Sequence, residues 1–237
     1  MMKQVHILVV RFRNELRFAS IPRFRGAVNA MLQSHDLLFH NHTPTGFRYS
    51  YPLIQYKRMN GRAALVCLEE GAESIGDFFA HIRQPVAYGE GDPAPLELES
   101  VQADKVLVQV WDTSFAYSLR KWIPLNSENY ARYQGLESLK ERIEFLERIL
   151  TGNILSFAKG LGIEIEQELR CSITDLTPLS PLIYKGIKFA AFDVAFRSNI
   201  SLPGYIGLGK GVSHGFGTVV RVGAQKKEQK ENEKNES

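Results

Sequence analysis

Two kinds of apolar pattern alternate along the first 111 residues, and their order is the strongest constraint on the fold. Short β-branched or aromatic runs are typical of buried strands, and apolar residues that recur every three to four positions are typical of a helix face. The expected elements are a strand over residues 5–12, a helix around 22–31, strands over 47–57 and 63–68, a short helix around 74–82 and a strand over 105–111. Asn60-Gly61, between the two middle strands, is a strong hairpin signal. This order predicts a ferredoxin-like βαββαβ unit.

The second half of the chain repeats part of that order. Leucines and isoleucines line one face of an expected helix over residues 136–154, and expected strands follow over 163–173, 187–196 and 218–222. No sequence repeat is visible, so the two halves are expected to match in topology only. The fold class predicted is α+β, with tandem ferredoxin-like domains over residues 1–104 and 105–223. Residues 225–237 contain no apolar residue, and a disordered charged tail is expected from residue 224.

A glycine-rich run precedes the last expected strand. Two Gly-apolar-Gly triplets, residues 207–209 and 215–217, bracket five residues that include Lys210 and His214. Glycines at this density let backbone N–H groups face an anion unobstructed, which favours a phosphate-binding loop. A P-loop is excluded because Gly211 stands where Ser or Thr is needed, and a dinucleotide fingerprint because Val212 replaces its third glycine. The alternative is a surface turn without a ligand.

Charge is unevenly distributed along the chain. The formal net charge is only +3, but residues 1–62 contain ten basic and two acidic residues, a local net of +8. A polyanion is the natural partner of such a surface, because Lys and Arg near phosphates release condensed counterions. A basic solvated surface without a ligand is the alternative.

A pair of histidines, His40 and His42, follows the first expected helix with one residue between them. In an extended backbone both rings point to the same face, so one can accept a proton while the other donates one. RNA offers a reaction for such a pair: a base deprotonates a ribose 2′-hydroxyl, the oxyanion attacks the adjacent phosphate, and an acid protonates the departing 5′-oxygen. A His-x-His with Asp36 nearby also suits a metal site, and ordinary loop histidines are a third interpretation.

The two glycine triplets near the C-terminus resemble the glycine-rich signature of the CRISPR-associated endoribonucleases that cut precursor CRISPR RNA within its repeats. These enzymes belong to the repeat-associated mysterious protein superfamily. The His-x-His after the first helix, with Tyr49 slightly downstream, is similar to the archaeal-type branch of the family. The resemblance extends over residues 5–222 and excludes the tail.

The resemblance implies a metal-independent endoribonuclease without cofactors that leaves 2′,3′-cyclic phosphate and 5′-hydroxyl ends. The expected catalytic residues are His40, His42 and Tyr49. The expected RNA-binding residues are Arg23, Arg25, Lys57, Gly207, Gly209, Lys210, Gly211, His214, Gly215 and Gly217.

CRISPR repeat RNA is therefore the expected partner, and a homodimer and association with a CRISPR effector complex are further expectations. The rival hypothesis is a non-catalytic subunit that binds guide RNA in an effector complex, since the fold alone does not distinguish the two. A cytoplasmic protein without a membrane partner is expected, because no apolar run reaches 18 residues. The two cysteines, Cys67 and Cys171, are too few for a disulfide framework.

Overall fold

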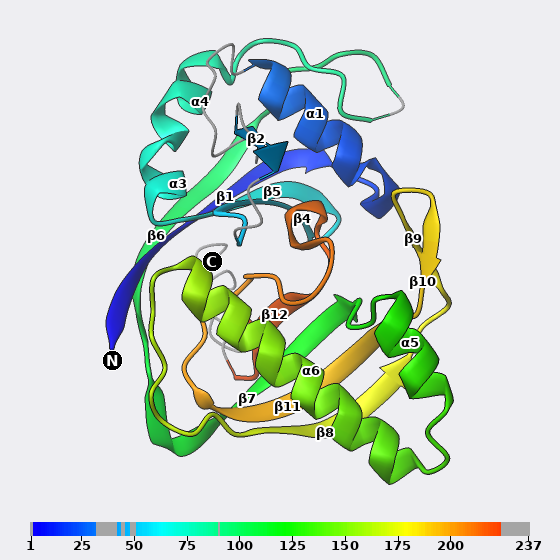
Figure 1. The fold of residues 1–237 in the computed structure, drawn as a ribbon. Helices are drawn as coiled ribbons and strands as arrows, with labels where there is room; N and C mark the ends of the chain where they lie inside the picture. The colour runs from blue at the N-terminus through cyan, green and yellow to red at the C-terminus, as the bar shows by residue number, and fades with distance from the viewer. Residues whose placement is uncertain (1, 32–41, 44–45, 48–50, 90, 224–237) are drawn as a thin grey trace.

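The N-terminal half forms one antiparallel sheet with helices on one face (Figure 1). The structure, a computed structural model, describes residues 2–31, 42–43, 46–47, 51–89 and 91–223. The sheet strands are β1 (Lys3–Glu15), β4 (Ile54–Met59), β5 (Arg62–Leu68) and β6 (Leu98–Val108). Their order, β4-β5-β1-β6, is that of a ferredoxin-like unit and confirms the predicted class.

Helices and short segments complete this half. They are η1 (Phe18–Ser20), α1 (Ile21–Met31), the short strands β2 (His42–Thr43) and β3 (Gly46–Phe47), α3 (Glu70–Glu73) and α4 (Ile75–His81). The Asn60-Gly61 turn joins β4 to β5 as predicted, because both residues have the positive φ, 48° and 85°, of a tight hairpin.

The C-terminal half forms a second antiparallel sheet in the order β12-β7-β11-β8. Its elements are β7 (Val110–Trp122), α5 (Ser127–Gln134), α6 (Leu139–Gly160), β8 (Cys171–Pro178), the hairpin β9 (Leu182–Tyr184) and β10 (Ile187–Phe189), β11 (Phe192–Ile200), η2 (Val212–His214) and β12 (Thr218–Arg221). The order again matches a ferredoxin-like unit. The glycine-rich segment occupies the chain position of the second helix, between β11 and β12.

Helix α6 packs its apolar stripe into the core, as its sequence predicts. A capping box between Ser138 and Glu141 begins the helix, and Leu146, Leu150 and Ile154 are buried. The helix continues six residues beyond the expected end at 154, and within it the Asn153 amide oxygen accepts a hydrogen bond from the indole N–H of Trp122 at 3.0 Å. Within the part of the chain that the structure describes, no helix combines the length and apolarity needed to cross a membrane.

One hydrophobic cluster is shared by the two domains. Alternate residues of β1 face opposite ways: Val10 and Phe12 pack in the cluster under α1, whereas Val5, Ile7 and Val9 pack in a cluster that contains C-terminal residues. That second cluster includes Leu119 of β7 and the buried stripe of α6. The N-terminal sheet is therefore covered by its own helices on one face and by the other domain on the opposite face.

The chain passes from one sheet to the other within a single residue, Gln109. β6 pairs with β1 as far as Val108, so the change of sheet lies four residues beyond the expected domain boundary at 104/105. Both polar groups of the Gln109 backbone form hydrogen bonds with Ser201. Its carbonyl accepts from the backbone N–H of Ser201 at 3.1 Å, and its N–H donates to the Ser201 hydroxyl at 3.3 Å.

Candidate nucleic-acid interface

The glycine-rich segment, residues 207–217, lies against the N-terminal domain. Figure 1 shows it, in orange, reaching β4 and the start of α1. Gly215 has φ of 81°, and a Cβ there would lie 2.7 Å from the Ile21 side chain and 3.3 Å from the Tyr56 carbonyl oxygen. Gly217, with φ of 60°, leaves no room for a Cβ beside the Leu208 carbonyl. At these two positions glycine is required by close packing and by the left-handed backbone.

Buried polar side chains of the N-terminal domain hold both ends of this segment. The Gly207 N–H donates to the Gln55 side-chain oxygen at 2.9 Å, and the Tyr51 hydroxyl donates to the Gly207 carbonyl at 2.8 Å. Gln55 also donates to the Tyr51 hydroxyl at 2.9 Å. At the other end, Lys57 Nζ donates to the Thr218 hydroxyl at 3.3 Å. These contacts fix the loop across the domain boundary.

Lys57 was expected to bind RNA, but its side chain is only 1% exposed. Gln55 and Lys57 point from β4 toward the C-terminal domain, whereas Ile54 and Tyr56 pack in the cluster under α1. Burial lowers the pKa of Lys57 to about 7. Its amine therefore faces the Thr218 hydroxyl and not the surface, and we assign it to the domain contact.

Cations surround the exposed side of the loop. Arg25 of α1 donates to the Ser213 hydroxyl at 3.3 Å, and the Lys210 amine lies 4.8 Å from the centre of the Phe189 ring. Burial, and after it the nearby Arg58, lower the pKa of Lys121, whose amine lies 3.4 Å from the centre of the Phe18 ring.

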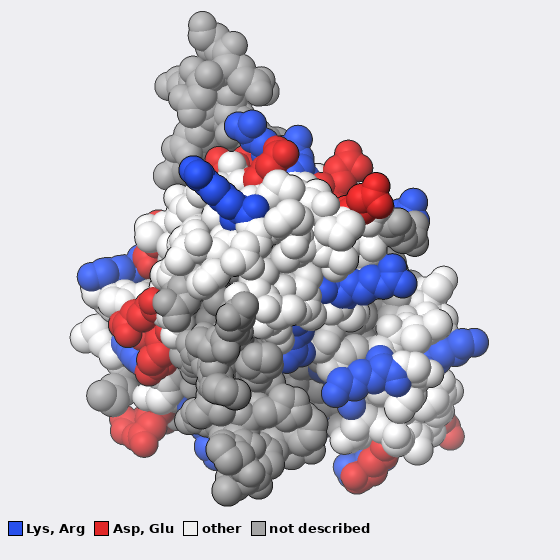
Figure 2. Space-filling model, turned by 90° about the horizontal axis from the view of Figure 1, so that it is seen from above, with Lys and Arg blue, Asp and Glu red and all other residues white. Residues whose placement is uncertain are grey.

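Three cations near the loop have no carboxylate partner within the described part of the chain. Among the described residues, Arg25, Lys185 and Lys210 form no ion pair with a carboxylate. Figure 2 shows Lys and Arg side chains gathered on the right-hand side, where Figure 1 places the start of α1 and the β9–β10 hairpin. The arrangement produces a positive potential beside the glycine-rich loop.

His214 lies within this group of cations. Its ring packs edge-to-face on Tyr184, with 5.4 Å between the ring centres, and its Nε2 is 3.4 Å from an Arg25 nitrogen. Burial first, then Arg25 and Lys185, lower the pKa of His214 to about 4. The ring is therefore neutral near pH 7.

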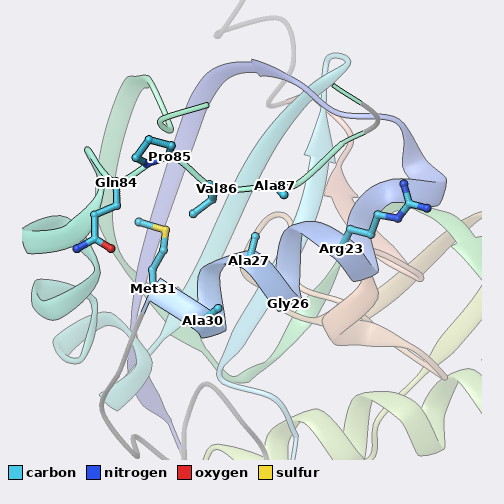
Figure 3. A pocket seen from close by; sticks show the side chains of 9 residues that line it. All are labelled: Arg23, Gly26, Ala27, Ala30, Met31, Gln84, Pro85, Val86 and Ala87. Carbon is cyan, nitrogen blue, oxygen red and sulfur yellow. The ribbon is translucent and has the colours of Figure 1, made fainter. Parts of the chain in front are cut away.

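The remaining predicted residues lie elsewhere or outside the described part of the chain. Arg23 is exposed on α1 at one end of an open cavity of about 470 Å³, with Gln84 at the other end (Figure 3). His42 lies in β2, where its backbone pairs with Phe47 of β3. His40 and Tyr49 lie outside the described residues. The catalytic assignment of these three residues thus stays a prediction.

Sequence reasoning missed the residues that position the loop. Tyr51 and Gln55 were interpreted only as part of a strand. In the structure the Gln55 side chain is 0% exposed, so its amide must have polar partners. Ser213 was passed over inside the glycine run. Tyr184 and Lys185 lie between two expected strands, at a hairpin whose Lys185-Gly186 turn has positive φ at both residues.

Two tandem ferredoxin-like sheets, with the glycine-rich loop of the second domain packed against the first, define a fold class that solved structures share. One solved structure, of Cas6b, superposes with a TM-score of 0.81 at 28% identity and covers 93% of this chain and 100% of its own. A second, of the CRISPR RNA processing endoribonuclease Cas6b, has a TM-score of 0.73 at 26% identity over 93% of this chain and 100% of its own.

Family comparison gives the particular branch. The Cas6b N-terminal domain matches residues 3–104, and the Cas6b C-terminal domain matches residues 109–222. The chain therefore belongs to the Cas6b family, which confirms the resemblance to CRISPR-associated repeat-cleaving endoribonucleases. A relative from Methanocaldococcus jannaschii, the uncharacterized protein MJ0978, is 42% identical over 101 residues, which cover 43% of this chain and 67% of that protein.

Proposed function

We propose that this protein is an endoribonuclease that binds CRISPR repeat RNA and cleaves precursor transcripts within the repeats. The observation that carries the proposal is the group of cations at the domain boundary, Arg25, Lys185 and Lys210, which lack carboxylate partners among the described residues. Cations without acidic partners are suited to an RNA backbone. Membership of the Cas6b family supports cleavage as well as binding.

The proposed chemistry is metal-independent transesterification. His40 and His42 transfer the two protons, one from the attacking 2′-hydroxyl and one to the departing 5′-oxygen, and Tyr49 assists at the same phosphate. Lys210 and Arg25 bind the RNA backbone and stabilise the negative charge near the cleaved bond. The products are a 2′,3′-cyclic phosphate and a 5′-hydroxyl end.

The test is cleavage of repeat RNA in excess EDTA with analysis of the product termini. We expect cyclic phosphate ends and a rate unchanged by EDTA. Cleavage that requires added metal would contradict the proposed chemistry, and intact RNA bound by the protein would support the rival function as a guide-RNA-binding subunit.

Single-turnover kinetics test the catalytic residues. His40→Ala and His42→Ala are each expected to lower the cleavage rate by about 100-fold or more while RNA affinity changes little. His6→Ala, at an exposed position on β1, is the matched control and should leave the rate unchanged. Loss of affinity in proportion to the loss of rate would refute the catalytic assignment.

A further inference from the structure

A small polar cluster joins the two domains beside the glycine-rich loop. Arg25 comes from α1 of the N-terminal domain, and Ser213 and His214 come from η2 of the C-terminal domain. One Arg25 nitrogen lies 3.3 Å from the Ser213 oxygen and 3.4 Å from His214 Nε2. His214 Nδ1 lies 3.1 Å from the same Ser213 oxygen. Each member of the cluster thus contacts the other two.

The chemistry of the donors decides which atom carries each hydrogen. A guanidinium group only donates, so His214 Nε2 must accept the hydrogen bond from Arg25 through its lone pair. A neutral imidazole that accepts at Nε2 carries its proton at Nδ1, and here that proton is donated to the Ser213 oxygen. The low pKa of His214, caused by burial and by Arg25 and Lys185, agrees with a neutral ring.

Donor and acceptor counts then show what remains for a ligand. The Ser213 oxygen accepts from both Arg25 and His214, which uses its two lone pairs and leaves the hydroxyl hydrogen to donate outward. Only one nitrogen of Arg25 takes part in the two contacts, so among the described residues the rest of its guanidinium fork is left to donate. Arg25 and Ser213 are both partly exposed.

We propose that Arg25 and Ser213 form a phosphate-binding subsite for one phosphodiester of the RNA, with His214 as a neutral positioning residue that orients both. The subsite rests on the function proposed above and refines it, because His214 then acts through Arg25 and Ser213 and does not itself bind a phosphate as a cation. The subsite requires residues of both domains, so it exists only when the glycine-rich loop is held against α1.

A double-mutant cycle on RNA binding tests this subsite. The ligand is a 2′-O-methylated repeat RNA, which cannot be cleaved because it lacks the attacking hydroxyl, and affinity is measured over a series of salt concentrations. Arg25→Gln is expected to weaken binding about tenfold and to lower the slope of log K against log salt by about 0.7 to 0.9, as for one lost phosphate contact. Ser213→Ala should weaken binding severalfold with the slope unchanged, since no charge is removed.

The positioning role makes a separate prediction. His214→Ala should weaken binding in the wild-type background but cause no further loss when Arg25 is already Gln. His214→Gln offers an amide oxygen to accept from Arg25 and should restore most of the affinity. Lys210→Ala is the matched control. In the double variant with Arg25→Gln, the two fold-losses of RNA affinity should multiply.

Two results would overturn the subsite while leaving the proposed function intact. One is an Arg25→Gln variant with wild-type affinity and salt slope. The other is an equal loss from His214→Ala in both backgrounds, which would make His214 an independent ligand. Failure of the wild-type protein to bind repeat RNA at all would instead reject the proposed function together with the subsite.

Discussion

Lys57 is a lysine buried between two domains, and its environment penalises the charged form. The Lys57 side chain is 1% exposed. Among the described residues, its one hydrogen-bond partner is the Thr218 hydroxyl. Desolvation lowers the folded-state pKa from the ordinary 10.5 to about 7. Near neutral pH the folded protein therefore holds this site partly deprotonated, whereas the unfolded chain holds it protonated.

A pH series of unfolding free energies tests this description. Between about pH 7 and 10.5 the unfolded state binds one more proton at this position, so Lys57 makes stability rise with pH by up to about 1.4 kcal/mol per unit. Lys57→Met removes the titrating group, so the variant should show a flatter rise over that window than the wild type. Lys188→Met, at an exposed position, should leave the wild-type slope. Parallel curves for wild type and Lys57→Met would disprove the low pKa.

At the level of elements, the glycine-rich loop differs most from its sequence-based interpretation. The spacing of its glycines identified the family, and the strand after it was predicted correctly. The sequence did not reveal that Gly215 and Gly217 are needed for packing, because the atoms that exclude a Cβ belong to Ile21 and Tyr56, far away in the chain, and to Leu208 across the loop. Glycine patterns report local backbone freedom, and such contacts arise only after folding.

Alanine substitutions separate the two reasons for glycine. Gly217 and Gly162 have similar positive φ, 60° and 67°, but a Cβ at Gly162 would meet no atom within 4 Å. Gly162→Ala should therefore lose about 1–2 kcal/mol from backbone strain alone. Gly217→Ala should lose clearly more, because the Leu208 carbonyl must also move. Urea unfolding measures both, and equal losses would show that the loop relaxes around the added methyl group.

At the scale of the whole molecule, a hydrophobic cluster spans both domains, so we expect them to unfold together. The pattern of strands and helices predicted the fold class, but the expected strands end at residue 111 and resume at 163, so they miss most of β7, a central strand of the second sheet. The sequence pattern could not show that Val5, Ile7 and Val9 face the other domain. A strand that is buried on both faces has the same apolar sequence whether a helix or another domain covers each face. The expected domain boundary at 104/105 coincides with the end of the N-terminal family match, and β6 continues beyond it to Val108.

Thermal unfolding should accordingly show one transition for the full chain. Ile7→Ala in the N-terminal sheet and Leu150→Ala in α6 remove side chains from the shared core, and each should destabilise that single transition by about 2–5 kcal/mol. Ile183→Ala, at a residue 64% exposed, should change stability by no more than about 0.5 kcal/mol. Two calorimetric transitions, each responding to only one of the core substitutions, would contradict the shared core.

The passage of the chain through Gln109 limits how the protein can respond to RNA. A single residue with both backbone groups held by Ser201 offers no slack for one half to swing against the other. We therefore expect the two described sheets to keep their relative position when RNA binds. On this expectation the flexible ribose-phosphate strand of a bound RNA adjusts to the two sheets.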